Sequence, residues 1–318
     1  MSYRFDPEIA AAISMLPDVD VSDLPAARER MAQLLEERLA EVDETGVEVR
    51  DEYVPGPEGA PEVRVRVYTP QRRATSALLF DVHGGGFVLG SPEAGHEGFV
   101  ELSRDLGVVV VSVDYRLAPE TPYPGGLEDC YAALVWAAEH ADELGVDPQR
   151  VVIHGVSAGG GLCAALALLA RDRGGPAIAF QYLGVPEVDD RLETASMRRF
   201  TDTPLWNRPN AEISWDSYLG PGVRGTGDVP VYAAPARATD LSGLPPAYVS
   251  VMEFDPLRDE GIAYAQQLLA AEVPTELHLF PGTFHGSSLI EHATVSRREA
   301  AEVRAVLARA LGVEQPGS

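Results

Sequence analysis

The stretch from residue 151 to residue 170, VVIHGVSAGGGLCAALALLA, places the strongest limit on what this chain can fold into. It opens with a β-branched run, passes through Gly155-Val156-Ser157-Ala158-Gly159, and continues as a long apolar run rich in Ala and Leu. We interpret it as a strand, a sharp turn and a buried helix, because the two glycines leave room where Cβ atoms would collide. Such a turn lifts a serine hydroxyl above the end of a sheet, so Ser157 is a candidate nucleophile.

The G-x-S-x-G pattern is weak evidence by itself. With 30 glycines among 318 residues, about 0.15 matches are expected by chance, so the pattern alone has a real false-positive risk. The alternative is a glycine-rich strand-to-helix connection that contains an incidental serine. The functional interpretation therefore depends on the surrounding sequence and on partner residues elsewhere in the chain.

Short, mostly continuous apolar runs recur along the chain and predict strands. Helical patterns fall between most of them, as strand–helix alternation in a parallel sheet covered on both faces requires. Two earlier segments, 47–54 and 63–68, are separated by a Pro- and Gly-rich turn, and we expect them to pair as an antiparallel edge. The apolar runs are 77–82, 108–113, 151–153, 178–183, 247–252 and 275–280, and the helical patterns include 127–143, 162–173, 257–272 and 295–311.

Two segments do not fit this alternation, and we expect them to form a helical cap over the sheet. Residues 1–45 are helical in pattern, with Asp23 as a helix cap and Gly46 as the end of that helix. Residues 189–240 lack a clear strand, and a segment of this length between strands is usually functional or a small subdomain. The alternative is a surface excursion with a few packed aromatic residues. The α/β core would then comprise residues 46–188 and 241–318.

A second glycine-rich segment, His83-Gly84-Gly85-Gly86, follows the strand predicted at 77–82. The backbone amides of Gly85 and Gly86, together with that of Ala158 after the serine, could point at one oxygen and form an oxyanion hole. We expect His83 to hold this loop by hydrogen bonding rather than to act as a base. The alternative for the loop is a flexible turn.

An acid and an imidazole follow the last two predicted strands. Asp255 precedes Pro256, which ends a strand and starts a helix, so its carboxylate is fixed near the strand end. Asp259 and Glu253 are alternative acids, although Asp259 better suits the start of the helix, where negative charge is favoured. His285 lies on the loop after the last strand, which gives the chain order Ser, Asp, His.

These residue types suit nucleophilic catalysis on a carbonyl group. A serine hydroxyl is a weak nucleophile and needs a base within hydrogen-bond reach. A neutral imidazole takes the proton and returns it to the leaving group, while a carboxylate fixes the tautomer of the imidazole. Ser157, His285 and Asp255 are therefore the candidate catalytic triad, and this chemistry requires no cofactor and no metal.

Composition limits the partners and the location. The formal net charge is −24, and all 25 basic residues are arginine, so we expect no binding to nucleic acid and no stable membrane association. No apolar run approaches the roughly 20 residues of a membrane span, and the first residues lack the pattern of a secretory signal. Only Cys130 and Cys163 occur, which makes a disulfide framework improbable and the cytoplasm the expected location.

With these motifs in one order, the chain resembles the hormone-sensitive-lipase-like esterases, the bacterial family IV branch of the α/β hydrolases. The stretches 114–120 (DYRLAPE), 181–189 and 255–261 (DPLRDEG) match that family, and the resemblance extends from about residue 47 to the end. It implies an α/β-hydrolase fold with an eight-stranded, mostly parallel sheet and a helical cap. It also implies hydrolysis of short- to medium-chain carboxylic esters, which are small-molecule substrates. Members of the family are often dimers through the sheet edge near the last strand, so a homodimer is one alternative and the oligomeric state stays open. The residues that match the family's triad and oxyanion hole are Ser157, Asp255 and His285, and Gly85, Gly86 and Ala158.

Two departures and three alternatives stay open. Val156 replaces a residue that is usually acidic in the family, and Ser287 replaces a frequent Phe, which leaves the polarity of the pocket unsettled. The chain could instead be a non-catalytic receptor on the same fold, although relatives of that kind lack the histidine found here as His285. It could catalyse another reaction in the same site, such as amide hydrolysis or dehydration. A purely structural role would leave the triad unused.

Overall fold

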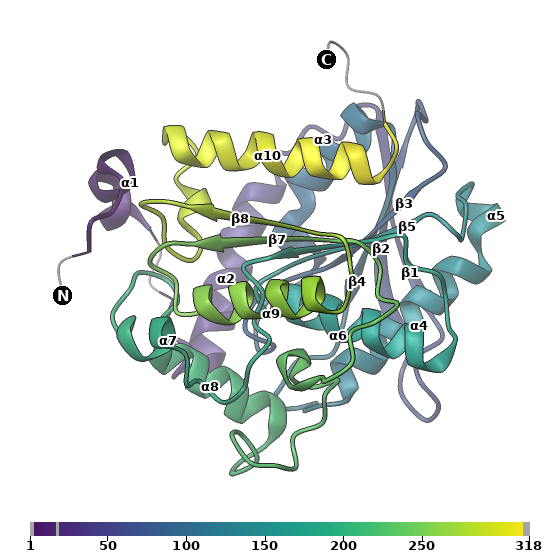
Figure 1. The fold of residues 1–318 in the computed structure, drawn as a ribbon. Coiled ribbons are helices and arrows are strands. Elements are labelled where there is room, and N and C mark those ends of the chain that lie inside the picture. The colour runs from purple at the N-terminus through teal and green to yellow at the C-terminus, as the bar shows by residue number, and fades with distance from the viewer. Residues whose placement is uncertain (1–2, 17–18, 314–318) are drawn as a thin grey trace.

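The predicted strands form one eight-stranded sheet in a computed structural model that describes residues 3–16 and 19–313 (Figure 1). Their spatial order is β1-β2-β4-β3-β5-β6-β7-β8. The strands are β1 (Val47–Val54), β2 (Val63–Pro70), β3 (Leu78–Val82), β4 (Val109–Asp114), β5 (Val151–Val156), β6 (Phe180–Gly184), β7 (Ala247–Met252) and β8 (Thr275–Phe280).

Strand direction confirms the predicted, mostly parallel sheet. β1 pairs antiparallel with β2, and β2 pairs antiparallel with β4. All remaining neighbours pair in parallel. Every residue of β3 and of β7 is buried, which explains why these strands are continuous apolar runs rather than alternating ones. Parallel strands end on one side, so the loops after β3, β5, β7 and β8 meet at a single edge of the sheet.

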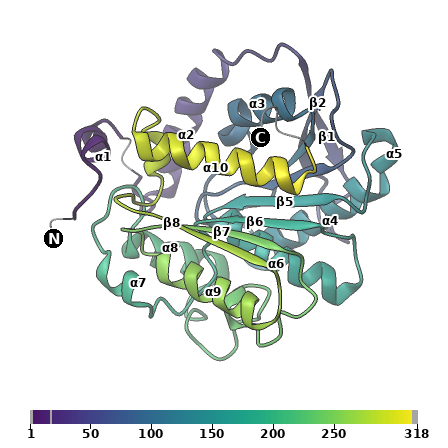
Figure 2. The same cartoon turned by 45° about the horizontal axis from the view of Figure 1, so that its top comes forward.

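Helices cover both faces of the sheet (Figures 1 and 2). Leu78 and Phe80 of β3 belong to one apolar core and Leu79 between them to another, because successive strand residues point to opposite faces. The first core is covered by α4 (Gly125–Glu139), α6 (Ala158–Arg173) and α9 (Arg258–Ala270). The second is covered by α3 (His96–Leu106) and α10 (Thr294–Ala310), the predicted last helix.

The two segments outside the alternation are helical and contain no strand in the described residues. Helices α7 (Ala195–Arg199) and α8 (Arg208–Leu219) and the short η3 (Pro235–Arg237) occupy the 189–240 segment. The first 45 residues contain α1 (Pro7–Ala12), η1 (Ile13–Met15) and α2 (Leu24–Leu39). The remaining short helices are η2 (Pro92–Gly95), α5 (Ala141–Leu144) and η4 (Ser287–Leu289).

Helix α2 begins as predicted but ends earlier. The Asp23 side chain accepts a hydrogen bond from the Ala26 amide at 3.2 Å, which confirms the cap. The prediction that Gly46 ends the helix is wrong, because α2 stops at Leu39 and the chain turns before β1. Of its residues only Ala27 is buried. The apolar residues Met31, Leu34, Leu35 and Leu39 recur at three- and four-residue spacing, but they do not form a face packed deeply against the core.

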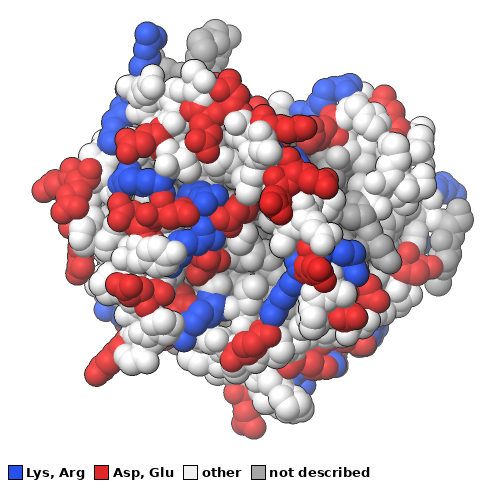
Figure 3. Space-filling view, turned by 180° about the vertical axis from the view of Figure 1, so that it is seen from behind, with Lys and Arg blue, Asp and Glu red and all other residues white. Residues whose placement is uncertain are grey.

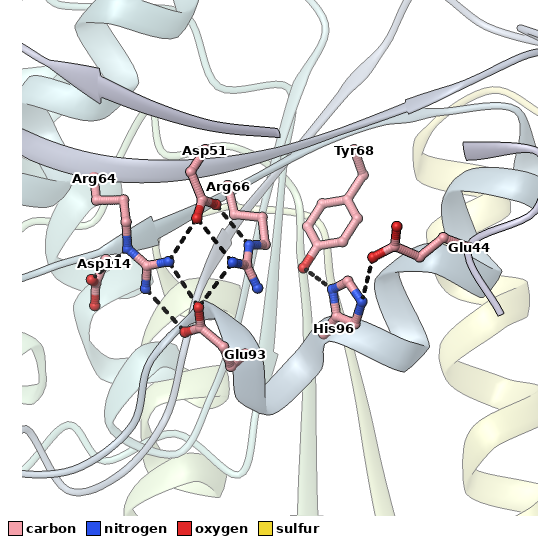
Figure 4. A network of polar contacts seen from close by, with 8 residues as sticks. All are labelled: Glu44, Asp51, Arg64, Arg66, Tyr68, Glu93, His96 and Asp114. Atoms are coloured by element: carbon pink, nitrogen blue, oxygen red, sulfur yellow. Dashed lines mark hydrogen bonds and ion pairs between the residues drawn. The ribbon is translucent and has the colours of Figure 1, made fainter. Parts of the chain in front are cut away.

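Ion pairs join the antiparallel edge of the sheet to its neighbours (Figure 4). Arg64 and Arg66 of β2 bind Asp51 of β1, Glu93 of η2 and Asp114 of β4. Close by, buried His96 contacts the Tyr68 hydroxyl and the Glu44 carboxylate, each at 3.2 Å. The β1–β2 edge therefore depends on charged contacts as well as on its apolar side chains.

Elsewhere the surface is strongly acidic, with 49 acidic and 25 basic residues in the chain. Figure 3 shows one face, on which acidic side chains spread widely and basic ones lie among them. None of the helices in the described part of the chain combines the length and hydropathy needed to cross a lipid bilayer.

Candidate active site

Ser157 lies at the turn between β5 and α6, as predicted. Its φ of 61° and ψ of −125° fall in a sparsely populated region, which costs a residue with a side chain on the order of 1–3 kcal/mol. A Cβ on Gly155 would lie 2.2 Å from the Gly159 carbonyl oxygen, and one on Gly159 would lie 2.0 Å from that of Val82. Only glycine fits at either position, and the tight turn holds the serine hydroxyl at the carboxyl end of the sheet.

His285 lies between Ser157 and Asp255. Its Nε2 is 3.0 Å from the Ser157 Oγ, and its Nδ1 is 2.8 Å from the Asp255 Oδ2. An ionised carboxylate only accepts hydrogen bonds, so Nδ1 carries the hydrogen and Nε2 is free to accept the serine proton. Asp255 is fully buried, and its other oxygen accepts the Leu257 amide at 2.8 Å. The structure thus brings together the three predicted side chains in an order that can draw a proton away from the hydroxyl.

The two alternative acids have other partners. Asp259 lies in the first turn of α9, where it accepts hydrogen bonds from the Ser196 amide at 2.7 Å and from Arg258 at 2.8 Å. Glu253 accepts the Gly282 amide at 2.7 Å and so shapes the loop that leads to His285. Neither of them contacts the imidazole, which leaves Asp255 as its acid partner.

The glycine-rich loop after β3 adopts backbone angles that favour glycine. Gly85 has φ of 121° and Gly86 has φ of 58°. A Cβ on Gly84 would lie 3.4 Å from the Ser157 Cβ, so the loop runs directly beside the candidate nucleophile. Within residues 3–16 and 19–313, no protein acceptor binds the amides of Gly85 and Gly86. The Ala158 amide begins α6, where helix geometry supplies no acceptor either, so all three predicted donors are available to an oxygen.

His83 supports this loop rather than the proton transfer. Its Nδ1 donates to the Gly84 carbonyl at 2.8 Å, and its ring stacks on Tyr115 with centroids 4.2 Å apart. Burial lowers the pKa of His83, which favours the neutral ring. The predicted role in holding the loop is confirmed.

Part of the 189–240 segment lies over the site. The Trp206 ring centroid is 5.9 Å from that of His285, and a Cβ on Gly86 would lie 2.4 Å from the same indole. A Cβ on Gly286 would lie 2.8 Å from the Leu205 Cδ1. Residues 205–206 therefore contact both the imidazole loop and the glycine-rich loop, although the limits of a cap domain stay a prediction.

Two polar residues beside the site escaped the sequence analysis. Glu187 follows β6, is fully buried, and donates its amide to the Ser157 carbonyl at 3.1 Å. Ser214 of α8 places its Oγ 2.8 Å from the Gly86 carbonyl oxygen and 3.2 Å from the Glu187 Oε1. Burial raises the pKa of Glu187 to about 8. The available signal was an acid three residues after the end of an apolar strand. It lies in the 181–189 stretch, which resembles the family but to which no role was assigned.

Comparisons with known proteins agree with this geometry. A family described as "alpha/beta hydrolase fold" matches residues 79–289. The carboxylesterase NlhH of Mycobacterium tuberculosis is 43% identical over 242 residues, which are 74% of this chain and 74% of that protein. The carboxylic ester hydrolase LipN of the same organism is 40% identical over 270 residues, 83% of this chain and 70% of that protein. A solved structure of a bacterial heroin esterase has a TM-score of 0.94 and 53% identity, and the match covers 97% of this chain and 98% of that one.

Proposed function

The chain belongs to the hormone-sensitive-lipase-like branch of the α/β-hydrolase superfamily, and from this premise we propose that it is a serine carboxylesterase. Its nucleophile is Ser157, its general base is His285, and Asp255 orients the imidazole. The observation that carries this proposal is the position of the His285 ring, within hydrogen-bond distance of both Ser157 and Asp255.

The reaction follows from these contacts. The Ser157 Oγ attacks the ester carbonyl carbon while its proton passes to the His285 Nε2. The C–O bond to the alcohol then breaks, the alcohol leaves with that proton, and the acyl group stays on Ser157. Water activated by His285 attacks the acyl-enzyme, the serine–acyl bond breaks, and the carboxylic acid is released. None of these steps requires a cofactor.

The oxyanion of each tetrahedral intermediate is bound by the amides of Gly85, Gly86 and Ala158. Their lack of protein acceptors in the described residues supports this role. Fixed donors of this kind act on charge that develops in the transition state, and one such donor is typically worth about 10²–10³ in kcat.

Short- to medium-chain carboxylic esters are the proposed substrates. Apolar groups near the nucleophile support an uncharged acyl group: Val156, next to Ser157, is 42% exposed, and Leu205 and Trp206 lie over the imidazole loop. A series of p-nitrophenyl esters from acetate to laurate tests this. We expect kcat/KM to be highest among the short and medium chains, and a maximum at laurate would contradict the proposal.

Labelling of the nucleophile tests the reaction class. We expect a fluorophosphonate probe to modify wild-type protein at Ser157 and to leave Ser157→Ala unmodified. Absence of labelling in a folded, wild-type sample would favour a receptor or structural role. Trapping of an acyl group on Ser157 from a p-nitrophenyl ester would separate hydrolysis from dehydration.

Homodimer formation through the β8 edge of the sheet is a further proposal. Leu277 and Leu279 of this edge strand are 40% and 39% exposed, and such an edge is usually covered or protected. Light scattering on wild type and on Leu277→Lys would test it, with a shift from dimer to monomer expected.

A cytoplasmic location is also proposed. It is supported by Cys130 and Cys163, which are buried free thiols, and cell fractionation would test it.

A further inference from the structure

The Ser214 hydroxyl lies near two oxygen atoms, but with one hydrogen it cannot donate a full hydrogen bond to both. Its Oγ lies 2.8 Å from the Gly86 carbonyl oxygen and 3.2 Å from the Glu187 Oε1. A hydroxyl has one hydrogen, and a carbonyl oxygen can only accept. The Gly86 carbonyl oxygen is the nearer of the two acceptors, so we assign the Ser214 hydrogen to it. The contact with Glu187 is then a hydrogen bond only if the carboxyl group itself carries a hydrogen.

The surroundings of Glu187 favour that neutral form. The side chain is fully buried, and its Oε2 has no hydrogen-bond partner among the described residues. The ionisable groups near enough to interact electrostatically with Glu187 include Asp255, Glu260 and Tyr115, none of which supplies a positive charge. The structure shows no ion pair between Glu187 and an arginine or histidine in the described part of the chain. Burial, aided by the negative charge of Asp255, raises the pKa of Glu187 to about 8.

The backbone of Glu187 also contacts the peptide unit that carries the Ala158 N–H, the oxyanion donor that follows Ser157. Its amide donates to the Ser157 carbonyl oxygen at 3.1 Å. That carbonyl and the Ala158 N–H belong to one planar peptide unit, so holding the oxygen fixes the direction of the N–H. The Glu187 amide, together with the Gly161 amide at 3.0 Å, therefore holds the peptide unit that carries the Ala158 N–H. The Glu187 side chain reaches the Gly86 segment through Ser214.

We propose that Glu187 is a positioning residue for the oxyanion hole: its neutral carboxyl group donates to Ser214, which donates to the Gly86 carbonyl and fixes that loop. This inference rests on the proposed esterase function. When Glu187 loses its proton, the single hydrogen of Ser214 turns to the carboxylate, the Gly86 carbonyl loses its donor, and the loop is released. The esterase therefore loses activity at alkaline pH through a group that never touches the substrate.

The test compares the pH dependence of kcat and KM in wild type, Glu187→Gln, Glu187→Ala and Ser214→Ala. In wild type we expect kcat to fall about tenfold between pH 7 and pH 9.5, with KM changed less than threefold, because part of the gain from one oxyanion donor is lost. Glu187→Ala and Ser214→Ala should show a comparable loss already at pH 7. Glu187→Gln, whose amide still donates to Ser214, should recover most of the activity that Glu187→Ala loses and should lack the alkaline decline.

The matched control is Glu260→Gln. Glu260 is also fully buried, but it accepts the amides of Val188 and Asp189 and does not contact the glycine-rich loop. This variant should keep the wild-type alkaline decline. If it loses that decline as Glu187→Gln does, neutralising any buried acid has the same effect and the specific role of Glu187 is rejected.

A readout independent of turnover decides the protonation state. The infrared carbonyl band of a protonated carboxyl group should be present in wild type at pH 7, weaken as pH rises through about 8, and be reduced in Glu187→Gln at pH 7. An unchanged band in Glu187→Gln at pH 7, or equal alkaline declines in wild type and Glu187→Gln, would overturn the proposal. Absence of both ester turnover and fluorophosphonate labelling in wild type would instead reject the esterase function and, with it, the positioning role, whatever the infrared result.

Discussion

A serine, a histidine and an aspartate meet at two places in this molecule, and only one of the two suits catalysis. In the sheet, His154 of β5 donates its Nδ1 hydrogen to Asp81 of β3 at 2.7 Å. The other oxygen of Asp81 accepts the hydroxyl of Ser112 of β4, also at 2.7 Å. The His–Asp distance is therefore as short here as in the candidate active site at the ends of the strands.

The order of the three groups differs between the two places. In the sheet the aspartate lies between the serine and the histidine, so the hydroxyl meets a weakly basic carboxylate. In the candidate site the imidazole lies between Ser157 and Asp255, so the hydroxyl meets the stronger base. Ser112 is 0% exposed in a regular strand. Ser157 is 7% exposed and lies on a turn beside amides that have no acceptor among the described residues. A His–Asp pair is therefore not enough to make a catalytic site. The position of the histidine between the serine and the aspartate, the exposure of the serine and the nearby amide donors distinguish the candidate active site.

The largest expected difference is between the two serines. We expect Ser157→Ala to lower kcat for p-nitrophenyl butyrate by at least about 10⁴, because the covalent step is lost. Ser112→Ala should keep kcat within about threefold and lower the free energy of unfolding by about 1 kcal/mol, the usual net value of one hydrogen bond. Steady-state kinetics and urea unfolding check both, and a similar loss of kcat in the two variants would contradict the distinction.

The aspartates give the next comparison. Asp255→Asn should lower kcat by about 10³–10⁴, because the amide no longer fixes the useful tautomer of His285. Asp81→Asn should act on stability instead, with a loss of about 1–3 kcal/mol and kcat within about threefold, since His154 and Ser112 then lose a charged partner. Kinetics at pH 7.5 with thermal unfolding measure both effects. Equal kcat in Asp255→Asn and wild type would count against the triad.

The backbone amides of the glycine-rich loop occur only at the candidate active site, and disturbing them should change kcat less than removing a triad side chain. Gly86→Ala should lower kcat by about 10²–10³, because φ of 58° and contact with Trp206 force the loop to move. Gly98→Ala, on α3 with no atom near the added Cβ, is the matched control and should keep wild-type kcat. Unchanged kcat in Gly86→Ala would contradict the expectation that the added Cβ displaces the loop and its amide.

The smallest expected effect is on the pH dependence of stability. Unlike Asp81 and Asp255, which accept hydrogen bonds with both oxygens, Glu187 has one oxygen without a partner among the described residues. The raised pKa of about 8 means that the folded state binds more protons at Glu187 than the unfolded state does. Its contribution to stability therefore falls as pH rises from about 4.5 to above 8. Relative to wild type, Glu187→Gln should gain melting temperature over this interval, by a few degrees at pH 9. A constant difference between pH 5 and pH 9 would indicate an ionised Glu187.

The sheet and the triad could be predicted from sequence because their signals are local. The strands are apolar runs, and Ser157, Asp255 and His285 each follow a strand with a recognisable turn. Glu187 and Ser214 could not be found in this way, since they meet only when α8, in a segment without a regular pattern, packs beside the end of β6. The early end of α2 escaped prediction for a related reason: few of its side chains are buried, so apolar spacing carries little information about its length.

Arg28 connects the amino-terminal segment to the chain beside the candidate active site. Its guanidinium donates to the carbonyl oxygens of Val88, beside the glycine-rich loop, and of Ala118, and it pairs with Glu120. A chain trimmed to begin at β1 would keep the three candidate catalytic side chains yet lose these hydrogen bonds to the segment that follows the glycine-rich loop. Shortening, fusing or immobilising the protein through its first helices is therefore expected to lower the turnover rate, and removing them would also expose core residues that now pack against Ile9 and Val21.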